Sequence, residues 1–191
     1  MTATYQKYTL NFKQPSGTSR GVLKTKETWF ISIISEEKKG IGECGMFRGL
    51  SIDDRPDFEA VLKWTCQNIF LGKEVLLLKL TEFPSIQFGL EMAFADLKHQ
   101  TPFELFPSKF TQGKDSIPIN GLIWMGTEAF MKEQITSKID AGFTCIKLKI
   151  GAIDFQTELD LLKSIRTHFS AKDIELRVDA NGAFLPEDAL E

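Results

Sequence analysis

The residues with the clearest chemical potential are two lysines, Lys147 and Lys149, in the segment 144–150. The segment alternates as a strand does, so both lysines point to one face while Ile146 and Leu148 point to the other. Two ammonium groups on the inner side of a sheet repel each other and are costly to bury, which favours the loss of one proton. A lysine without its proton can act as a general base. The plainer alternative is a strand end from which both lysines reach solvent.

A second segment, 174–182, alternates in the same way. Leu176 and Val178 take one face, and Asp179 and Asn181 take the other. Asp179 would lie at the carboxyl end of its strand, where α/β proteins place their ligands. A carboxylate there suits a hard cation such as Mg²⁺, which takes oxygen ligands. The alternative is a strand-end aspartate that caps the following turn.

The elements that must position these residues alternate along the second half of the chain. The pattern predicts strands over 117–124, 144–150 and 174–179, separated by helices that Thr127 and Asp154 begin. Strands that alternate with helices of this length indicate βαβ units and a parallel sheet.

The first half of the chain predicts a small α+β unit. Alternating residues indicate strands over 5–12 and 29–34, a polar loop over 15–21 and a short strand from Ile41. One helix is expected after a cap at Asp53 or Asp54, and another from about Ser85. Three antiparallel strands with helices therefore precede the βαβ units.

Composition limits the class of partner and the compartment. Lys and Arg total 23 and Asp and Glu total 26, so the net charge of −3 gives no electrostatic basis for binding nucleic acid. No apolar run approaches the roughly 18 residues that a membrane helix needs. Three cysteines without metal or disulfide spacing, and N-terminal residues without an apolar core, predict a cytoplasmic protein.

Taken together, the two polar strand ends resemble a known family. Lys147-x-Lys149 followed by Asp179-x-Asn181 on consecutive parallel strands is similar to the enolase superfamily, in its muconate-lactonizing branch. Within that branch the o-succinylbenzoate synthases are the most similar, on the segments 42–51, 88–93 and 118–121.

The resemblance implies a fold. Residues 1–108 would form the family's α+β capping domain, and residues 109–191 would form the first βα units of a (β/α)8 TIM-type barrel. A whole barrel needs about 250 residues, so about three strands fit and the barrel stays incomplete in this chain. The family's other acidic metal ligands and a second lysine belong to later strands. We therefore expect this chain, as a truncated half, to be inactive by itself.

The resemblance also implies roles for the residues. Lys149 would be the base that removes a proton α to a carboxylate, and Lys147 would hold that carboxylate or ease the loss of the Lys149 proton. Asp179 would bind Mg²⁺, which stabilises the enediolate. The residues proposed to contact substrate are Arg20, Phe47, Leu50, Asn120 and Asn181.

The implied activity is Mg²⁺-dependent dehydration of a small-molecule carboxylate in menaquinone biosynthesis. A homo-oligomer is compatible with the family, whereas nucleic acid and membrane partners are not expected. One alternative is a dipeptide epimerase or N-succinylamino acid racemase, which would use the same lysine strand. The other is a non-catalytic fragment or degenerate relative.

Overall fold

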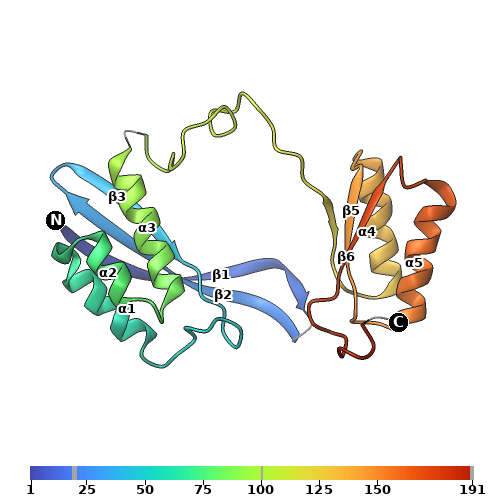
Figure 1. Cartoon of the computed structure of the whole chain (residues 1–191), viewed down its shortest axis with the longest axis horizontal. Coiled ribbons are helices and arrows are strands. Elements are labelled where there is room, and N and C mark those ends of the chain that lie inside the picture. Colours follow the sequence, from blue (N-terminus) through green and yellow to red (C-terminus); the bar gives the residue numbers. More distant parts are fainter. Residues whose placement is uncertain (19–20, 100, 190–191) are drawn as a thin grey trace. The chain divides into compact units, whose positions relative to one another are not determined.

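The computed structural model describes residues 1–18, 21–99 and 101–189, and the chain divides into two compact units (Figure 1). The first unit comprises Met1–Lys13 and Lys24–Ser116, and the second comprises Gln14–Leu23 and Ile117–Glu191. Residues 101–120 contain neither helix nor strand. The domain boundary predicted after residue 108 falls in this connecting segment and stays a prediction.

The N-terminal sheet has three strands, as predicted (Figure 1). Strands β1 (Thr2–Thr18), β2 (Gly21–Ser35) and β3 (Lys38–Cys44) are ordered β1-β2-β3, and β2 pairs with β3 antiparallel. The loop predicted from residue 15 is wrong over 15–18, because β1 continues through Pro15 to Thr18. Strand β1 lies at the edge of the sheet, where a proline without an N–H group is tolerated.

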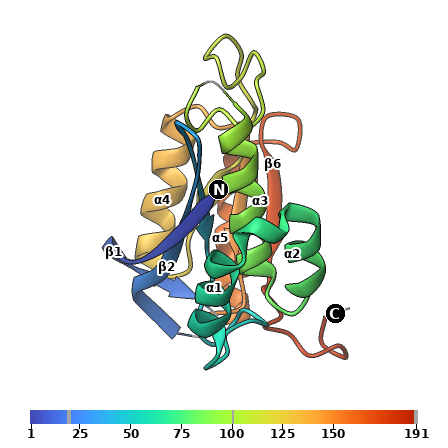
Figure 2. The same cartoon turned by 90° about the vertical axis from the view of Figure 1, so that its left-hand side faces the viewer.

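Helices α1 (Phe58–Gln67), α2 (Lys73–Lys79) and α3 (Pro84–Lys98) complete the first unit with a short 3-10 helix, η1 (Ile69–Leu71). Helix α3 lies against the sheet (Figure 2). Two glycines allow this close approach, since a Cβ at Gly42 would lie 1.8 Å from the carbonyl oxygen of Gly89. The core beneath α3 is mainly apolar, with Trp29, Ile31 and Leu90 among its buried residues.

The start of α1 differs from the sequence prediction. The helix begins at Phe58 after Asp57, and neither Asp53 nor Asp54 caps it. Asp53 is buried and instead accepts hydrogen bonds from the backbone N–H (2.7 Å) and the hydroxyl (3.0 Å) of Ser85, in the first turn of α3. The expected cap therefore stabilises a helix about thirty residues further along the chain.

The second unit is a three-stranded parallel sheet with two helices. Its elements are β4 (Gly121–Ile123), α4 (Glu128–Asp140), β5 (Cys145–Lys149), α5 (Phe155–His168) and β6 (Glu175–Asp179), with strand order β4-β5-β6. Thr127 and Asp154 cap their helices as predicted, accepting from the N–H groups of Phe130 and Thr157. Strand β4 is shorter than predicted. The expected α+β unit followed by an incomplete parallel barrel is confirmed.

The buried face of this sheet packs under α4 and α5 (Figure 1). Ile146 and Leu148 are buried, so Lys147 and Lys149 point to the opposite face, as alternation predicts. Leu176 packs on the same core, but Val178 is 52% exposed. Strand β6 ends the sheet, and no described element covers Val178.

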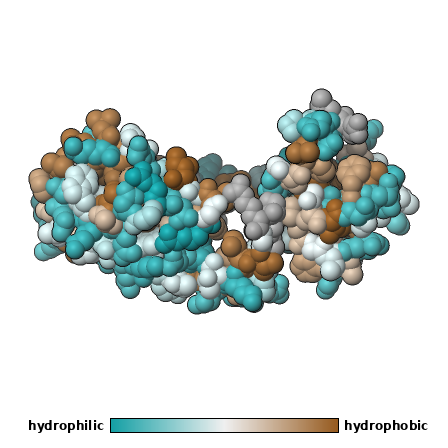
Figure 3. Space-filling model, turned by 90° about the horizontal axis from the view of Figure 1, so that it is seen from below, coloured by the Kyte–Doolittle hydropathy of each residue, from teal (hydrophilic) through white to brown (hydrophobic). Residues whose placement is uncertain are grey.

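The surface mixes polar and apolar side chains. On the face that Figure 3 presents, hydrophobic residues form separate patches among hydrophilic ones. Among the described residues, none of the helices has the length and apolar character needed to cross a membrane.

Candidate active site

The two strands that carry the predicted site lie side by side. Strands β5 and β6 are parallel neighbours, with Lys147 opposite Arg177 and Lys149 opposite Asp179. The Nζ atom of Lys147 lies 2.7 Å from Oδ2 of Asp179, and both side chains are about one-third exposed. The structure thus brings Lys147, Lys149 and Asp179 together on one face at the carboxyl ends of their strands.

Asp179 is held in its ionised form by its surroundings. The hydrogen bond from Lys147 is the main cause that lowers the pKa of Asp179, and the backbone N–H of Asn181 (3.1 Å to Oδ1) lowers it further. The Asn181 side-chain amide donates to the backbone carbonyl of Asp179 at 3.1 Å. Asp179 and Asn181 therefore also stabilise the turn after β6. Asp179 thus caps this turn, the alternative considered from the sequence, and also forms the ion pair with Lys147.

Lys149 has a different neighbour. Its Nζ atom lies 4.1 Å from the centroid of the Trp124 ring, and no carboxylate of the described residues is within ion-pair distance of it. Trp124 directly follows β4. Its backbone is fixed by Gln134 of α4, whose Oε1 accepts from the Trp124 N–H (2.9 Å) and whose Nε2 donates to the Trp124 carbonyl (3.0 Å).

The loop after the lysine strand is held by a buried carboxylate. Glu158 of α5 accepts the backbone N–H of Gly151 at 2.8 and 2.9 Å, and lies within 3.3 Å of the Ala152 nitrogen and 3.5 Å of the Ile153 nitrogen. Since this loop starts two residues after Lys149, Glu158 helps to fix where the lysine strand ends.

Sequence reasoning missed Trp124 and Glu158. Glu158 could have been found as the one charged residue on the buried side of α5, where Leu161 and Ile165 follow at helical spacing. Trp124 directly follows β4, at the strand end that the sequence predicts. The sequence gives no sign, however, of which side chain the Trp124 ring would contact.

The predicted substrate contacts come from different parts of the chain. Phe47 and Leu50 belong to the first unit, where the Phe47 ring lies 4.7 Å from Nζ of Lys26 and Leu50 is exposed. Asn120 is half-buried just before β4. Arg20 lies outside the described residues. Asn181 touches the candidate site, through Asp179.

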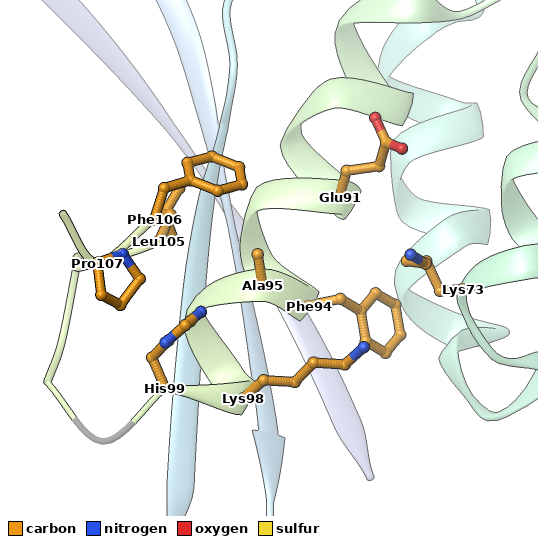
Figure 4. Close-up of a pocket in the computed structure, with 9 residues that line it drawn as sticks. All are labelled: Lys73, Glu91, Phe94, Ala95, Lys98, His99, Leu105, Phe106 and Pro107. Atoms are coloured by element: carbon orange, nitrogen blue, oxygen red, sulfur yellow. The ribbon is translucent and has the colours of Figure 1, made fainter.

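A separate hollow lies on the first unit (Figure 4). It encloses about 470 Å³ between the end of α3, with Phe94, Lys98 and His99, and the following segment, with Phe106. None of the described residues predicted for the site lines it.

Comparison with known proteins identifies the chain. Residues 1–97 match the family model described as MenC, N-terminal domain, and residues 130–191 match the one described as enolase C-terminal domain-like. The chain belongs to the MenC family of the enolase superfamily. The family resemblance inferred from the lysine strand is therefore confirmed.

Two curated relatives of this MenC-family chain carry different names. It is 40% identical to an o-succinylbenzoate synthase of Desulfotalea psychrophila, over 99% of this chain and 60% of the relative. It is 36% identical to an L-Ala-D/L-Glu epimerase of Francisella tularensis, over 49% of this chain and 26% of that protein. The chain thus spans about 60% of the length of the curated synthase that it matches.

Solved structures show the same fold. MenC from Desulfotalea psychrophila superposes with a TM-score of 0.79 at 35% identity, over 99% of this chain and 59% of that one. An o-succinylbenzoate synthase from Thermosynechococcus elongatus, solved with Mg in its active site, has a TM-score of 0.70 at 22% identity, over 97% of this chain and 53% of that one. The second match, at its lower identity, supports the fold alone.

The donor atoms present fit a magnesium ion only in part. The Asp179 carboxylate is a hard oxygen ligand of the kind Mg²⁺ prefers. Within residues 1–18, 21–99 and 101–189, however, no three His, Cys, Asp or Glu residues form a group that could hold a metal ion. The described residues therefore do not form a complete metal site by themselves.

Proposed function

We propose that the protein is a lyase of the o-succinylbenzoate synthase type. It would remove a proton α to a carboxylate of a small-molecule substrate and expel a hydroxyl group, as water, from the neighbouring carbon. The observation that carries the proposal is the convergence of Lys147, Lys149 and Asp179 on adjacent parallel strands. The 40% identity to an o-succinylbenzoate synthase supports the choice of substrate class.

Lys149 is the proposed base. Once Lys149 has given up its own proton, its Nζ amine would take the α-proton, and the C–H electron pair would pass into the enolate. The enolate would then expel the hydroxyl group, which would take the proton from Lys149 and leave as water. The amine lies against an aromatic ring, and no acidic side chain of the described residues forms an ion pair with it.

Lys147 and Asp179 are proposed to act as a charged pair beside the base. The Lys147 ammonium has three donors, of which Asp179 uses one, so it can also bind a substrate carboxylate. We propose Asp179 as one oxygen ligand of a magnesium site. When bound, the ion would stabilise the negative charge that develops on the substrate carboxylate.

The test compares Lys149→Ala with Lys163→Ala in the full-length protein, with the succinyl-hydroxycyclohexadiene carboxylate substrate and Mg²⁺. Lys163 lies on α5 and its side chain is 63% exposed, so its loss should leave turnover unchanged. Loss of a general base should lower kcat about a hundredfold to ten-thousandfold, with an unchanged circular dichroism spectrum. Wild-type activity in Lys149→Ala would refute the assigned base.

A second function, epimerisation of a dipeptide, is favoured by the match to the Francisella epimerase. Both reactions begin with the same proton transfer, so the lysine strand does not separate them. The wild-type protein should be incubated with L-Ala-L-Glu in D₂O. Deuterium at the α-carbon of the dipeptide, with no dehydration of the cyclohexadiene substrate, would establish the epimerase and exclude the lyase.

A further inference from the structure

The two lysines of β5 share one face but have different partners. The strand register places Lys149, and not Lys147, directly opposite Asp179. Yet Lys147, two residues earlier, makes the ion pair with Asp179 at 2.7 Å. The ammonium of Lys149 instead lies over Trp124, 4.1 Å from the ring centroid. Strand register therefore does not determine which of the two lysines forms the ion pair with Asp179.

The Trp124 ring stands on a fixed backbone. Strand β4 ends at Ile123, so the N–H and C=O of Trp124 have no ladder partner beyond that point. Gln134 of α4 satisfies both groups with its side-chain amide, at 2.9 and 3.0 Å. Such a paired contact fixes the backbone from which the indole projects, and Trp124 is 38% exposed.

The face of an indole attracts an ammonium group, because the ring quadrupole is negative there. The flat ring also restricts the rotamers open to a long, flexible lysine side chain. The carboxylate opposite Lys149 in the register is that of Asp179, and it already binds Lys147.

We propose that Trp124 is a positioning residue that keeps the Lys149 side chain apart from Asp179. This leaves Lys147 as the partner of the carboxylate and Lys149 as the amine offered to substrate. The pairing of Lys147 with Asp179 and of Lys149 with Trp124 is supported by the described contacts alone. The consequence of this pairing for turnover rests on the proposed function.

The first test is spectroscopic and does not depend on enzyme activity. In full-length protein with ¹³C-labelled lysine, the ring current of Trp124 should move the Lys149 ε-methylene resonance upfield, and Lys149→Arg assigns that resonance. Trp124→Leu should abolish the shift, and Trp124→Phe should keep part of it. Trp64→Leu is the matched control, since Trp64 is 37% exposed on α1 of the first unit. An unchanged resonance in Trp124→Leu would overturn the proposal.

The second test is kinetic. Trp124→Leu should lower kcat about tenfold, which corresponds to about 1.4 kcal/mol, while KM changes less than about twofold. Trp124→Phe should recover most of the loss, a rescue that a purely structural role of the indole would not give. Equal falls in Trp124→Leu and Trp124→Phe would contradict the role of the aromatic face.

The two tests separate the two proposals. If the wild-type protein is active but the resonance does not depend on Trp124, the positioning role fails and the lyase assignment stands. If the resonance depends on Trp124 but the wild-type protein does not dehydrate the substrate, the lyase assignment fails and the contact between Trp124 and Lys149 stands.

Discussion

Glu158 provides the sharpest test of how the lysine strand is anchored. Its side chain is 3% exposed, and its carboxylate faces the backbone N–H groups of the loop over residues 151–153. That loop joins β5, which ends at Lys149, to α5. Removing the carboxylate should therefore loosen the end of the strand that carries the proposed base.

The size of the effect follows from the contacts. The bonds to Gly151 are short and charge-assisted, which makes them worth about 1.5–3 kcal/mol, and the two longer contacts add about 0.5 kcal/mol each. The space left by the side chain adds about 1 kcal/mol. Glu158→Ala should thus lower the free energy of unfolding by about 4 kcal/mol. Glu158→Gln keeps one acceptor oxygen and should cost about 2 kcal/mol.

The assay is urea unfolding followed by circular dichroism, together with hydrogen exchange of the amides of residues 151–153. Glu133→Ala is the control, because Glu133 is exposed on the neighbouring helix α4. The three loop amides should exchange faster in Glu158→Ala and not in Glu133→Ala. If Glu158→Ala costs less than about 0.5 kcal/mol and leaves these amides protected, the carboxylate does not hold the loop.

Two further predictions concern packing and charge. Gly89→Ala should lower the free energy of unfolding of the first unit by more than about 2 kcal/mol, because the new Cβ would lie 2.4 Å from Sγ of Cys44. A melting temperature equal to that of the wild-type protein would refute the close contact. The pKa of Asp179 is lowered, so the stability from its pair with Lys147 is present above the ordinary aspartate value of 3.8 and is lost as the pH falls through the lower folded value. In Lys147→Met, a ¹³C titration should find the pKa of Asp179 closer to that ordinary value, whereas Lys132→Met, a lysine on α4, should leave the titration unchanged.

The second unit could be predicted almost entirely from the sequence because its signals are local. The alternation around Lys147 places the strand and its buried face, and the caps at Thr127 and Asp154 act on N–H groups three residues away. Asp179 was expected beside the lysines because parallel neighbours end at the same edge of a sheet. These inferences need no knowledge of distant contacts.

The errors and omissions involve contacts between residues far apart in the sequence. Asp53 resembles a cap for the next helix, but its partner is Ser85, and sequence spacing does not reveal such a pair. The long edge strand through Pro15 depends on pairing rather than on propensity. The same limit hid Trp124, whose importance arises only where its ring meets Lys149 across the sheet.

The contact between α3 and β3 has a consequence for motion. A Cβ at Gly40 would lie 2.1 Å from the Ala93 carbonyl oxygen, and a Cβ at Gly42 would lie 1.8 Å from that of Gly89, so backbone meets backbone at these two positions. Sliding of packed elements relies on side chains that can change rotamer between them, and at these two glycines β3 has none. Helix and strand should therefore move as one rigid body. Any rearrangement of the first unit would have to occur by hinging in its connecting loops, such as residues 45–57, which contain neither helix nor strand.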